Sequence, residues 1–117
     1  MSSIEFDTDD APKIRRRANQ DVADRVAVRR AVAELVRSIE ALQTETVFLR
    51  ALVARHPAAQ EDLVPRIVTL GQGVKAACTR FDAVVATLSE RQQGHSRVED
   101  IRRTLEALKA SVPRLSN

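Results

Sequence analysis

Apolar residues recur along most of this chain at alternating steps of four and three positions. Over residues 28–53 the alternation runs without a slip, which keeps one row of side chains on a single face of a helix. This spacing is typical of helices that pack lengthwise in a left-handed supercoil. We name this row the first seam, and its apolar members are Val28, Val32, Leu35, Ile39, Leu42, Leu49 and Val53.

Two further rows repeat the same spacing later in the chain. The second seam consists of Leu63, Ile67, Leu70, Val74, Ala77, Phe81, Val84 and Leu88. The third seam consists of Val98, Ile101, Leu105, Leu108 and Val112. None of the three stretches has the short alternating runs, bounded by turn residues, that indicate β-strands. The pattern therefore predicts three helices and no sheet.

Residues that break helices separate the three seams. Pro57 disfavours helical backbone at His56, and Gly94 favours a left-handed helix stop. Ser96 followed by Glu99 forms a capping-box pattern that marks a helix start. These signals predict helices at about 11–55, 62–91 and 97–111.

The connections between the predicted helices are short, so consecutive helices are expected to be antiparallel. The sequence therefore predicts an all-α fold, an antiparallel up-down-up three-helix bundle with coiled-coil-like packing and a long first helix. Residues 1–10 are acidic and lack periodicity, and we expect them to form a flexible acidic arm. We assign residues 11–113 to the helical bundle and residues 114–117, after Pro113, to a tail.

Several residues within the seams allow two interpretations. Gly71 and Gly73 mark either a hinge or a close approach of a neighbouring helix, and the unbroken spacing across them favours close packing. Thr46 occupies the polar position of the first seam, where it either fixes the register with a partner or bonds to its own helix; we favour the second. Cys78 is the single cysteine and is expected to act as a small buried apolar residue.

Basic residues are most concentrated before residue 31. The chain has a formal net charge of +3, and its basic residues are concentrated in one segment where only Asp21 and Asp24 oppose them. We name this the basic segment, and its cations are Lys13, Arg15, Arg16, Arg17, Arg25, Arg29 and Arg30. Continuing the first seam backward places Asp21 and Arg25 on it, so the bundle is expected to end near residue 27. Here a different stripe of apolar residues, four positions apart, consists of Ile14, Ala18, Val22 and Val26.

Side chains suited to catalysis are scarce. The chain has two histidines, one cysteine and no tyrosine, and an active site requires titratable groups that converge. His56 and His95 lie in the two predicted turns, at opposite ends of the second helix. We therefore predict that the protein is not an enzyme and that it has no catalytic, metal-binding or cofactor-binding residues. No leader peptide or membrane-spanning stretch is apparent, so we expect a cytoplasmic protein with no membrane partner.

Helix lengths suggest what the protein does. The third predicted helix is too short to cover the two longer ones, and we expect a second copy or another protein to cover the remaining apolar surface. The alternative is that the N-terminal part of the first helix folds back at Asn19 and covers it. We predict a noncatalytic protein-protein interaction or assembly module, namely a scaffold, an adaptor or a small structural subunit of a larger complex. The bias toward Ala, Arg and Val suggests a bacterial protein.

The basic segment suggests an alternative function. Arginines on a helix can neutralise phosphates, so the region from Lys13 to Arg30 is a candidate for binding the backbone of RNA or DNA. No aromatic residues are interleaved for base stacking, which restricts this alternative to backbone contact. A further alternative is that the acidic residues 5–10 fold over these arginines and mask them.

Overall fold

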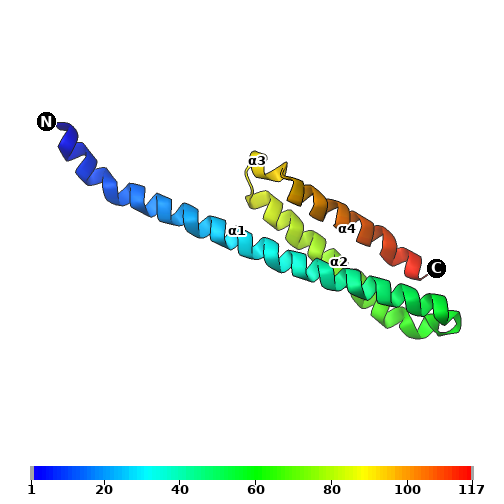
Figure 1. Ribbon diagram of the computed structural model, residues 1–117. Helices are drawn as coiled ribbons and strands as arrows, with labels where there is room; N and C mark the ends of the chain where they lie inside the picture. The colour runs from blue at the N-terminus through cyan, green and yellow to red at the C-terminus, as the bar shows by residue number, and fades with distance from the viewer. Residues whose placement is uncertain (1, 117) are drawn as a thin grey trace. The chain divides into compact units, whose positions relative to one another are not determined.

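The computed structural model describes residues 2–116 and the side chains of residues 15–90 and 92–116. Its elements are helix α1 (Ser2–Arg55), the short 3-10 helix η1 (Pro57–Ala59), and helices α2 (Gln60–Thr87), α3 (Glu90–Gln93) and α4 (Ser96–Leu115) (Figure 1). No strand occurs within residues 2–116, so the predicted all-α class is confirmed. The chain divides into two units, Met1–Ala31 and Val32–Asn117, which we describe separately.

Residues 32–116 form a helical bundle around one core. The core residues come from α1, α2 and α4, and each is at most 8% exposed. They are Leu35, Ile39, Leu49, Ile67, Leu70, Val74, Ala77, Phe81, Ile101, Leu105, Leu108 and Leu115. Because all three long helices contribute to this cluster, the predicted three-helix bundle is confirmed.

Contacts between the helices show their relative directions within the bundle. Along α1 and α2, Arg66 bonds to Glu45 and Arg80 to Ser38, so residue numbers rise on one helix as they fall on the other. The same holds for α2 and α4. Gln60 at the start of α2 bonds to the carbonyl of Leu115 at the end of α4, and Phe81 further along α2 lies under Arg102, which is earlier on α4. Both α1 and α4 therefore run antiparallel to α2 and parallel to each other (Figure 1).

The predicted seam residues differ in how deeply they lie. The buried members are Leu35, Ile39, Leu49, Ile67, Leu70, Val74, Ala77, Phe81, Ile101, Leu105 and Leu108. The half-buried members are Val28, Val32, Leu42, Val53, Leu63, Val84, Leu88, Val98 and Val112. Except for Leu42, the half-buried residues lie toward the ends of their seams, where fewer neighbouring helices can cover them.

Helix α1 begins at Ser2, although we predicted a start near residue 11 after an arm at residues 1–10. The first ten residues contain neither glycine nor proline. Their acidic side chains are also favoured near a helix N-terminus, where the helix dipole is positive. A lack of apolar periodicity therefore did not prevent a helix here, and α1 is continuous through Asn19.

The second predicted helix, 62–91, is wrong at both ends. Pro57 starts the turn η1, which leads directly into α2 at Gln60. Helix α2 ends at Thr87 because Leu88 adopts an extended conformation with φ −86° and ψ 148°. Residues 90–93 instead form the separate short helix α3.

A capping box starts α3, whereas we predicted one at Ser96 and Glu99. The Ser89 hydroxyl accepts a hydrogen bond from the Gln92 backbone amide, and the Gln92 side chain accepts one from the Ser89 backbone amide. Ser89 and Gln92 are three positions apart, as the motif requires. This Ser-x-x-Gln pattern lay inside the predicted second helix, and the seam through Leu88 concealed it.

Helix α4 spans Ser96–Leu115 instead of the predicted 97–111. Its N-cap is His95, whose Nδ1 accepts a hydrogen bond from the Arg97 backbone amide at 3.1 Å. The left-handed stop predicted at Gly94 is also wrong, since this glycine has a φ of −83°. His95 supplies the cap, and Gly94 therefore only completes an ordinary turn.

The C-terminal turn of α4 includes residues that we had assigned to a tail after Pro113. Proline removes one backbone hydrogen bond from a helix. In return, the continued helix buries Leu115, which is 4% exposed, and its carbonyl accepts a hydrogen bond from Gln60 Nε2 at 3.0 Å. These two contacts offset the bond lost at Pro113.

The two glycines of α2 lie in an uninterrupted helix, so they do not break it. A Cβ atom on Gly73 would lie 2.8 Å from Leu42 Cδ2, and one on Gly71 would lie 3.4 Å from Val112 Cγ1. Gly73 therefore permits a close approach of α1, and Gly71 a looser approach of α4. The packing interpretation is confirmed for Gly73.

Candidate functional site

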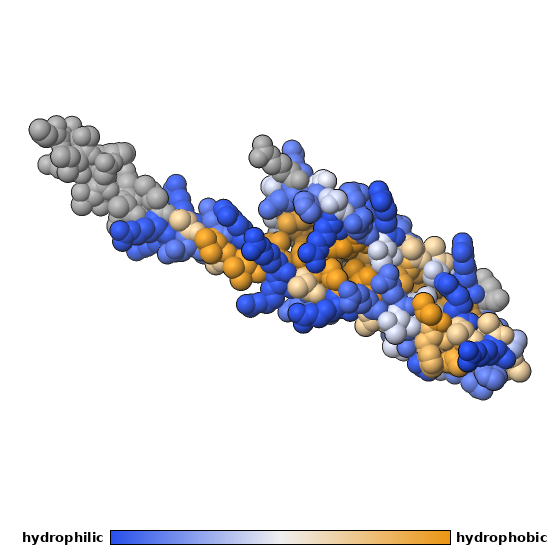
Figure 2. Space-filling model, in the orientation of Figure 1, coloured by the Kyte–Doolittle hydropathy of each residue, from blue (hydrophilic) through white to orange (hydrophobic). Residues whose placement is uncertain are grey.

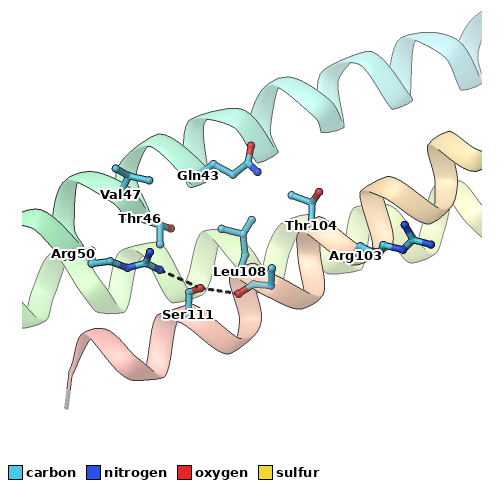
Figure 3. A pocket seen from close by; sticks show the side chains of 9 residues that line it. Gln43, Thr46, Val47, Arg50, Arg103, Thr104, Leu108 and Ser111 are labelled. Atoms are coloured by element: carbon cyan, nitrogen blue, oxygen red, sulfur yellow. Dashed lines mark hydrogen bonds between the residues drawn. The ribbon is translucent and has the colours of Figure 1, made fainter.

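In the part of the bundle that the structure describes, one groove lies between α1 and α4 and another between α1 and α2. The first, which we name the α1/α4 groove, has a volume of about 380 Å³. Its lining residues come from both helices (Figure 3), and they are Gln43, Thr46, Val47, Arg50, Arg103, Thr104, Ala107, Leu108 and Ser111. The close-up shows these side chains between the two parallel helices, with Arg50 and Ser111 near one end and Arg103 toward the other.

Hydroxyl groups in the α1/α4 groove donate to their own helices. Thr46 Oγ1 donates to the Leu42 carbonyl at 2.7 Å, which confirms the intrahelical bond predicted for this buried residue. Thr104 and Ser111 make equivalent bonds four residues back. Ser111 Oγ also accepts a long hydrogen bond of 3.4 Å from Arg50 Nη2. The three hydroxyl groups therefore already use their hydrogen-bond donors, whereas the Arg50 guanidinium has further N–H groups that can bind a ligand.

The α1/α4 groove has an apolar floor, and the charged side chains in its lining are positive. Leu108 is buried beneath the groove, while Val47 in the wall is 64% exposed. Ala107 adds a small, exposed apolar side chain to the lining. Arg50 and Arg103 lie among the lining residues, and no carboxylate lines this part of the described structure. The groove thus combines an apolar surface with two guanidinium groups that lack an acidic partner there.

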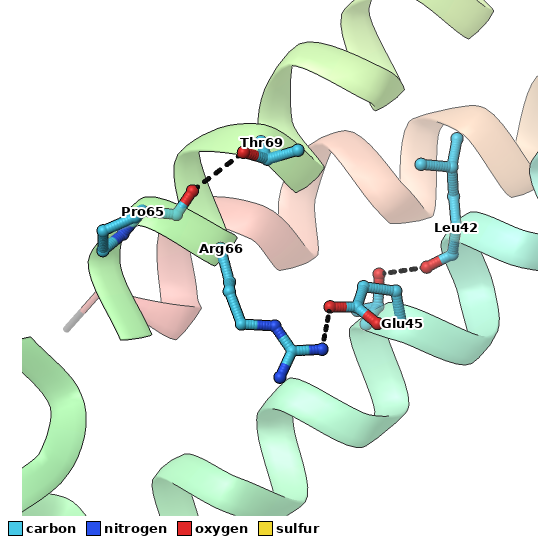
Figure 4. Close-up of polar contacts among 6 residues, drawn as sticks. Leu42, Glu45, Pro65, Arg66 and Thr69 are labelled. Atoms are coloured by element: carbon cyan, nitrogen blue, oxygen red, sulfur yellow. Dashed lines mark hydrogen bonds and ion pairs between the residues drawn. The ribbon is translucent and has the colours of Figure 1, made fainter. Parts of the chain in front are cut away.

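The second groove, which we name the α1/α2 groove, has a volume of about 450 Å³. It is lined by Leu42, Glu45, Pro65, Arg66, Thr69, Leu70 and Gly73 (Figure 4). Arg66 Nη2 bonds to Glu45 Oε1 at 2.8 Å. The same guanidinium lies over the half-exposed ring of Phe48, 5.1 Å from its centroid. The charges of this groove therefore neutralise each other.

The basic segment presents its cations to solvent wherever the structure describes them. The exposed arginines are Arg15, Arg16, Arg17, Arg25, Arg29 and Arg30. The Lys13 side chain lies outside the described residues. Among the described side chains, residues 15–90 and 92–116, the ion pairs are Arg66 with Glu45 and Arg102 with Glu99, so none involves these arginines.

Apolar side chains are exposed in the same part of α1. Val22 is 57% and Val26 47% exposed, and every described side chain from residue 15 to residue 27 is exposed. Hydrophobic residues are visible on the surface of α1 in Figure 2. Ile14, the first member of the predicted stripe, has a side chain outside the described residues. The other three members, Ala18, Val22 and Val26, are all exposed.

Histidine and cysteine side chains are dispersed. His56 precedes η1 and is exposed, and His95 caps α4 beyond the other end of α2. Burial raises the pKa of the half-buried Cys78 thiol above 9.0; Lys109 opposes this rise, and Asp82 and Glu106 add to it. Within the described residues, no three His, Cys, Asp or Glu side chains are grouped closely enough to hold a metal ion. Within the same residues, no helix has the length and apolarity needed to cross a membrane.

Sequence reasoning missed the α1/α4 groove. Its polar residues are scattered along the sequence, away from the densest run of charges, so they do not stand out as one common surface. The available signal was the four-residue spacing of Arg103, Ala107 and Ser111, which places them on one face of α4. That face forms a groove only because α1 lies beside it and contributes Val47 and Arg50.

Comparisons of the chain with protein-family models, with curated proteins and with solved structures find no match.

Proposed function

We propose that this protein is a noncatalytic helical interaction module that works as a scaffold, an adaptor or a small structural subunit of a larger complex. Its partner is a second copy of the chain, another protein, or both. The observation that carries the proposal is the exposure of Val22 and Val26 on a helical segment whose described side chains are all exposed through residue 27.

Physical chemistry links that exposure to assembly. A helix without tertiary packing is only marginally stable in water, because its stability in proteins comes mainly from burying an apolar face. Val22 and Val26 lie four residues apart, on one face. Covering both would remove apolar surface from water at about 25 cal/mol per Å². A partner helix therefore stabilises this segment more than solvent does.

Assembly is tested with the full chain and two double variants. Val22→Glu with Val26→Glu places charges on the exposed apolar stripe. Ala23→Glu with Ala27→Glu adds the same charges at neighbouring positions, rotated by about 100° around the helix. We expect the wild type to associate with itself or to retain a partner in pull-downs, the first variant to lose this, and the second to keep it.

Sedimentation velocity and light scattering from micromolar concentration upward provide the measurement. A wild-type chain that stays monomeric and retains no partner contradicts the proposal. Equal effects of the two variants would show that added charge, and not loss of the apolar stripe, caused the change.

The exposed arginines support a second candidate function, binding of an RNA or DNA backbone through Lys13–Arg30. Such binding weakens with salt because each neutralised phosphate releases counterions; the logarithm of the binding constant falls with a slope of about −0.9 per contact on duplex DNA. Titration of labelled RNA and DNA at low and moderate salt tests this. Binding that is absent, or insensitive to salt, eliminates the second candidate.

A further inference from the structure

We propose that the α1/α4 groove receives an acidic amphipathic helix of a partner protein, which completes a four-helix arrangement. This inference rests on the proposed function, since it names the chemistry of the partner at a particular surface. Amphipathic helices bind in grooves by placing their apolar face on an apolar floor. Leu108 is buried beneath the groove and supplies that floor, and Val47 and Ala107 add exposed apolar side chains to the lining.

Charge distinguishes this groove from the α1/α2 groove. In the α1/α2 groove, Arg66 is already paired with Glu45. In the α1/α4 groove, Arg50 makes only a 3.4 Å contact to a hydroxyl, and Arg103 has no ion-pair partner among the described residues. Arginine binds carboxylates through two parallel hydrogen bonds. The complementary occupant therefore carries carboxylates.

The positions of the two arginines set the spacing of those carboxylates. Arg50 contacts Ser111, which follows Arg103 by eight residues on α4. At 1.5 Å per residue, the two arginine positions lie about 12 Å apart along the groove. A helix that meets both carries acidic residues seven or eight positions apart, with apolar residues between them. Glu40 and Asp100 precede the lining residues Gln43 and Arg103 by one turn, and they disfavour further acidic residues beyond that end.

Charge also argues against the basic segment of a second copy as the occupant. That segment presents arginines from Arg15 to Arg30, and its helix would place them against Arg50 and Arg103. Like charges placed together at an interface are strongly unfavourable. A separate acidic helix fits where this segment does not.

The experiment titrates the isotope-labelled full chain with a synthetic helical peptide of about 18 residues, long enough to span the groove. The peptide carries leucines on one face and two glutamates eight positions apart; a matched peptide has lysines in place of the glutamates. Nuclear magnetic resonance detects even weak binding and locates it. We expect the glutamate peptide to shift the backbone signals of Gln43, Val47, Ala107 and Ser111, and the lysine peptide to leave them unchanged.

Variants of the chain test the groove and its charge separately. Ala107→Glu blocks the groove, and its matched control Ala110→Glu places the same side chain three residues further along α4, on an exposed face. We expect Ala107→Glu to weaken glutamate-peptide binding about tenfold or more, as loss of a central complementary contact does, and Ala110→Glu to leave it unchanged. Arg50→Glu combined with Arg103→Glu reverses both charges, so this double variant should lose the glutamate peptide and gain the lysine peptide. The amide spectrum of each free variant verifies its fold.

Several results would overturn the inference. Signal shifts outside the groove, no shifts at all, or equal binding of the two peptides exclude an acidic helix at this site. Self-association that disappears only in Ala107→Glu identifies a second copy as the occupant instead. If the groove variants have no effect while Val22→Glu with Val26→Glu still abolishes assembly, the inference fails and the proposed function stands.

Discussion

At the scale of single residues, a missing side chain can matter as much as one that is present. Gly71 and Gly73 both lie in α2, yet they differ in what a Cβ atom would meet. At Gly71 the nearest atom, in Val112, is at an ordinary contact distance. At Gly73 an atom of Leu42 is too close and must move. The sequence identified both glycines as packing positions, but it contained no information on their different neighbours.

This difference predicts the effect of alanine at each position. Alanine is favoured over glycine in a helix interior by about 1 kcal/mol. We expect Gly71→Ala to raise the free energy of unfolding by up to about this amount. Gly73→Ala should raise it less or lower it, because the Leu42 side chain must shift. Urea denaturation monitored by circular dichroism measures both, and an equal gain in the two variants contradicts the expected contact.

Cys78 predicts a pH dependence of stability. Burial raises the pKa of its thiol in the folded state above 9.0, the value expected in the unfolded chain. The folded state then holds the proton more tightly, so this contribution to stability is complete below pH 9.0 and is lost as the pH rises through the folded pKa.

Comparison of wild type with Cys78→Ala isolates this contribution. The free energy of unfolding of the wild type should fall more between pH 8 and the region above 9.0 than that of the variant. Urea unfolding at a series of pH values measures the difference. Parallel pH profiles for the two proteins would show that the thiol does not contribute.

At the scale of elements, seam spacing predicted which stretches are helical, and local side-chain chemistry decided where they end. The three long helices follow from apolar periodicity, which persists over many turns. Their ends depend on single hydrogen bonds, such as the one between His95 and the Arg97 amide. Ser89 with Gln92 and Ser96 with Glu99 are similar capping patterns in the sequence, and the structure uses only the first as a capping box. The burial of Leu115 after Pro113 is a similar case, since a tertiary contact outweighed a local helix breaker.

The observed caps predict unequal effects of two serine substitutions. Ser89→Ala removes the N-cap of α3 and should lower the free energy of unfolding by about 1 kcal/mol. Ser96→Ala should have little effect, since Ser96 is the first residue within α4 and the His95 side chain supplies the cap. Thermal and urea denaturation of the two variants test this. A larger loss in Ser96→Ala would restore the capping box first expected there.

At the scale of the whole molecule, the sequence predicted the fold class but not the groove between α1 and α4. The fold class follows from many apolar residues whose spacing indicates the same structure, so wrong predictions at a few helix ends do not change it. A groove depends on which faces of two distant segments meet. Arg50 and Ser111 are far apart in the sequence, and no local pattern links them. The basic segment was visible in the sequence because its members are close together.

Assembly predicts that stability depends on concentration. Anything that binds the folded chain in preference to the unfolded chain raises its apparent stability by mass action. If Val22 and Val26 are covered by a second copy, the midpoint of thermal unfolding should rise with protein concentration. The rise should disappear in the variant with Val22→Glu and Val26→Glu. Calorimetry over a wide concentration range measures this, and a midpoint independent of concentration excludes self-association through these residues.

The parallel course of α1 and α4 has a consequence for the polarity of any helix that enters between them. Both helices point their negative carboxyl ends the same way, and Arg50 and Ser111 lie nearer those ends than Arg103 does. Neighbouring dipoles attract when they point in opposite senses. A guest helix is therefore favoured with its positive amino end beside Arg50 and the two carboxyl ends, so that its dipole opposes those of α1 and α4.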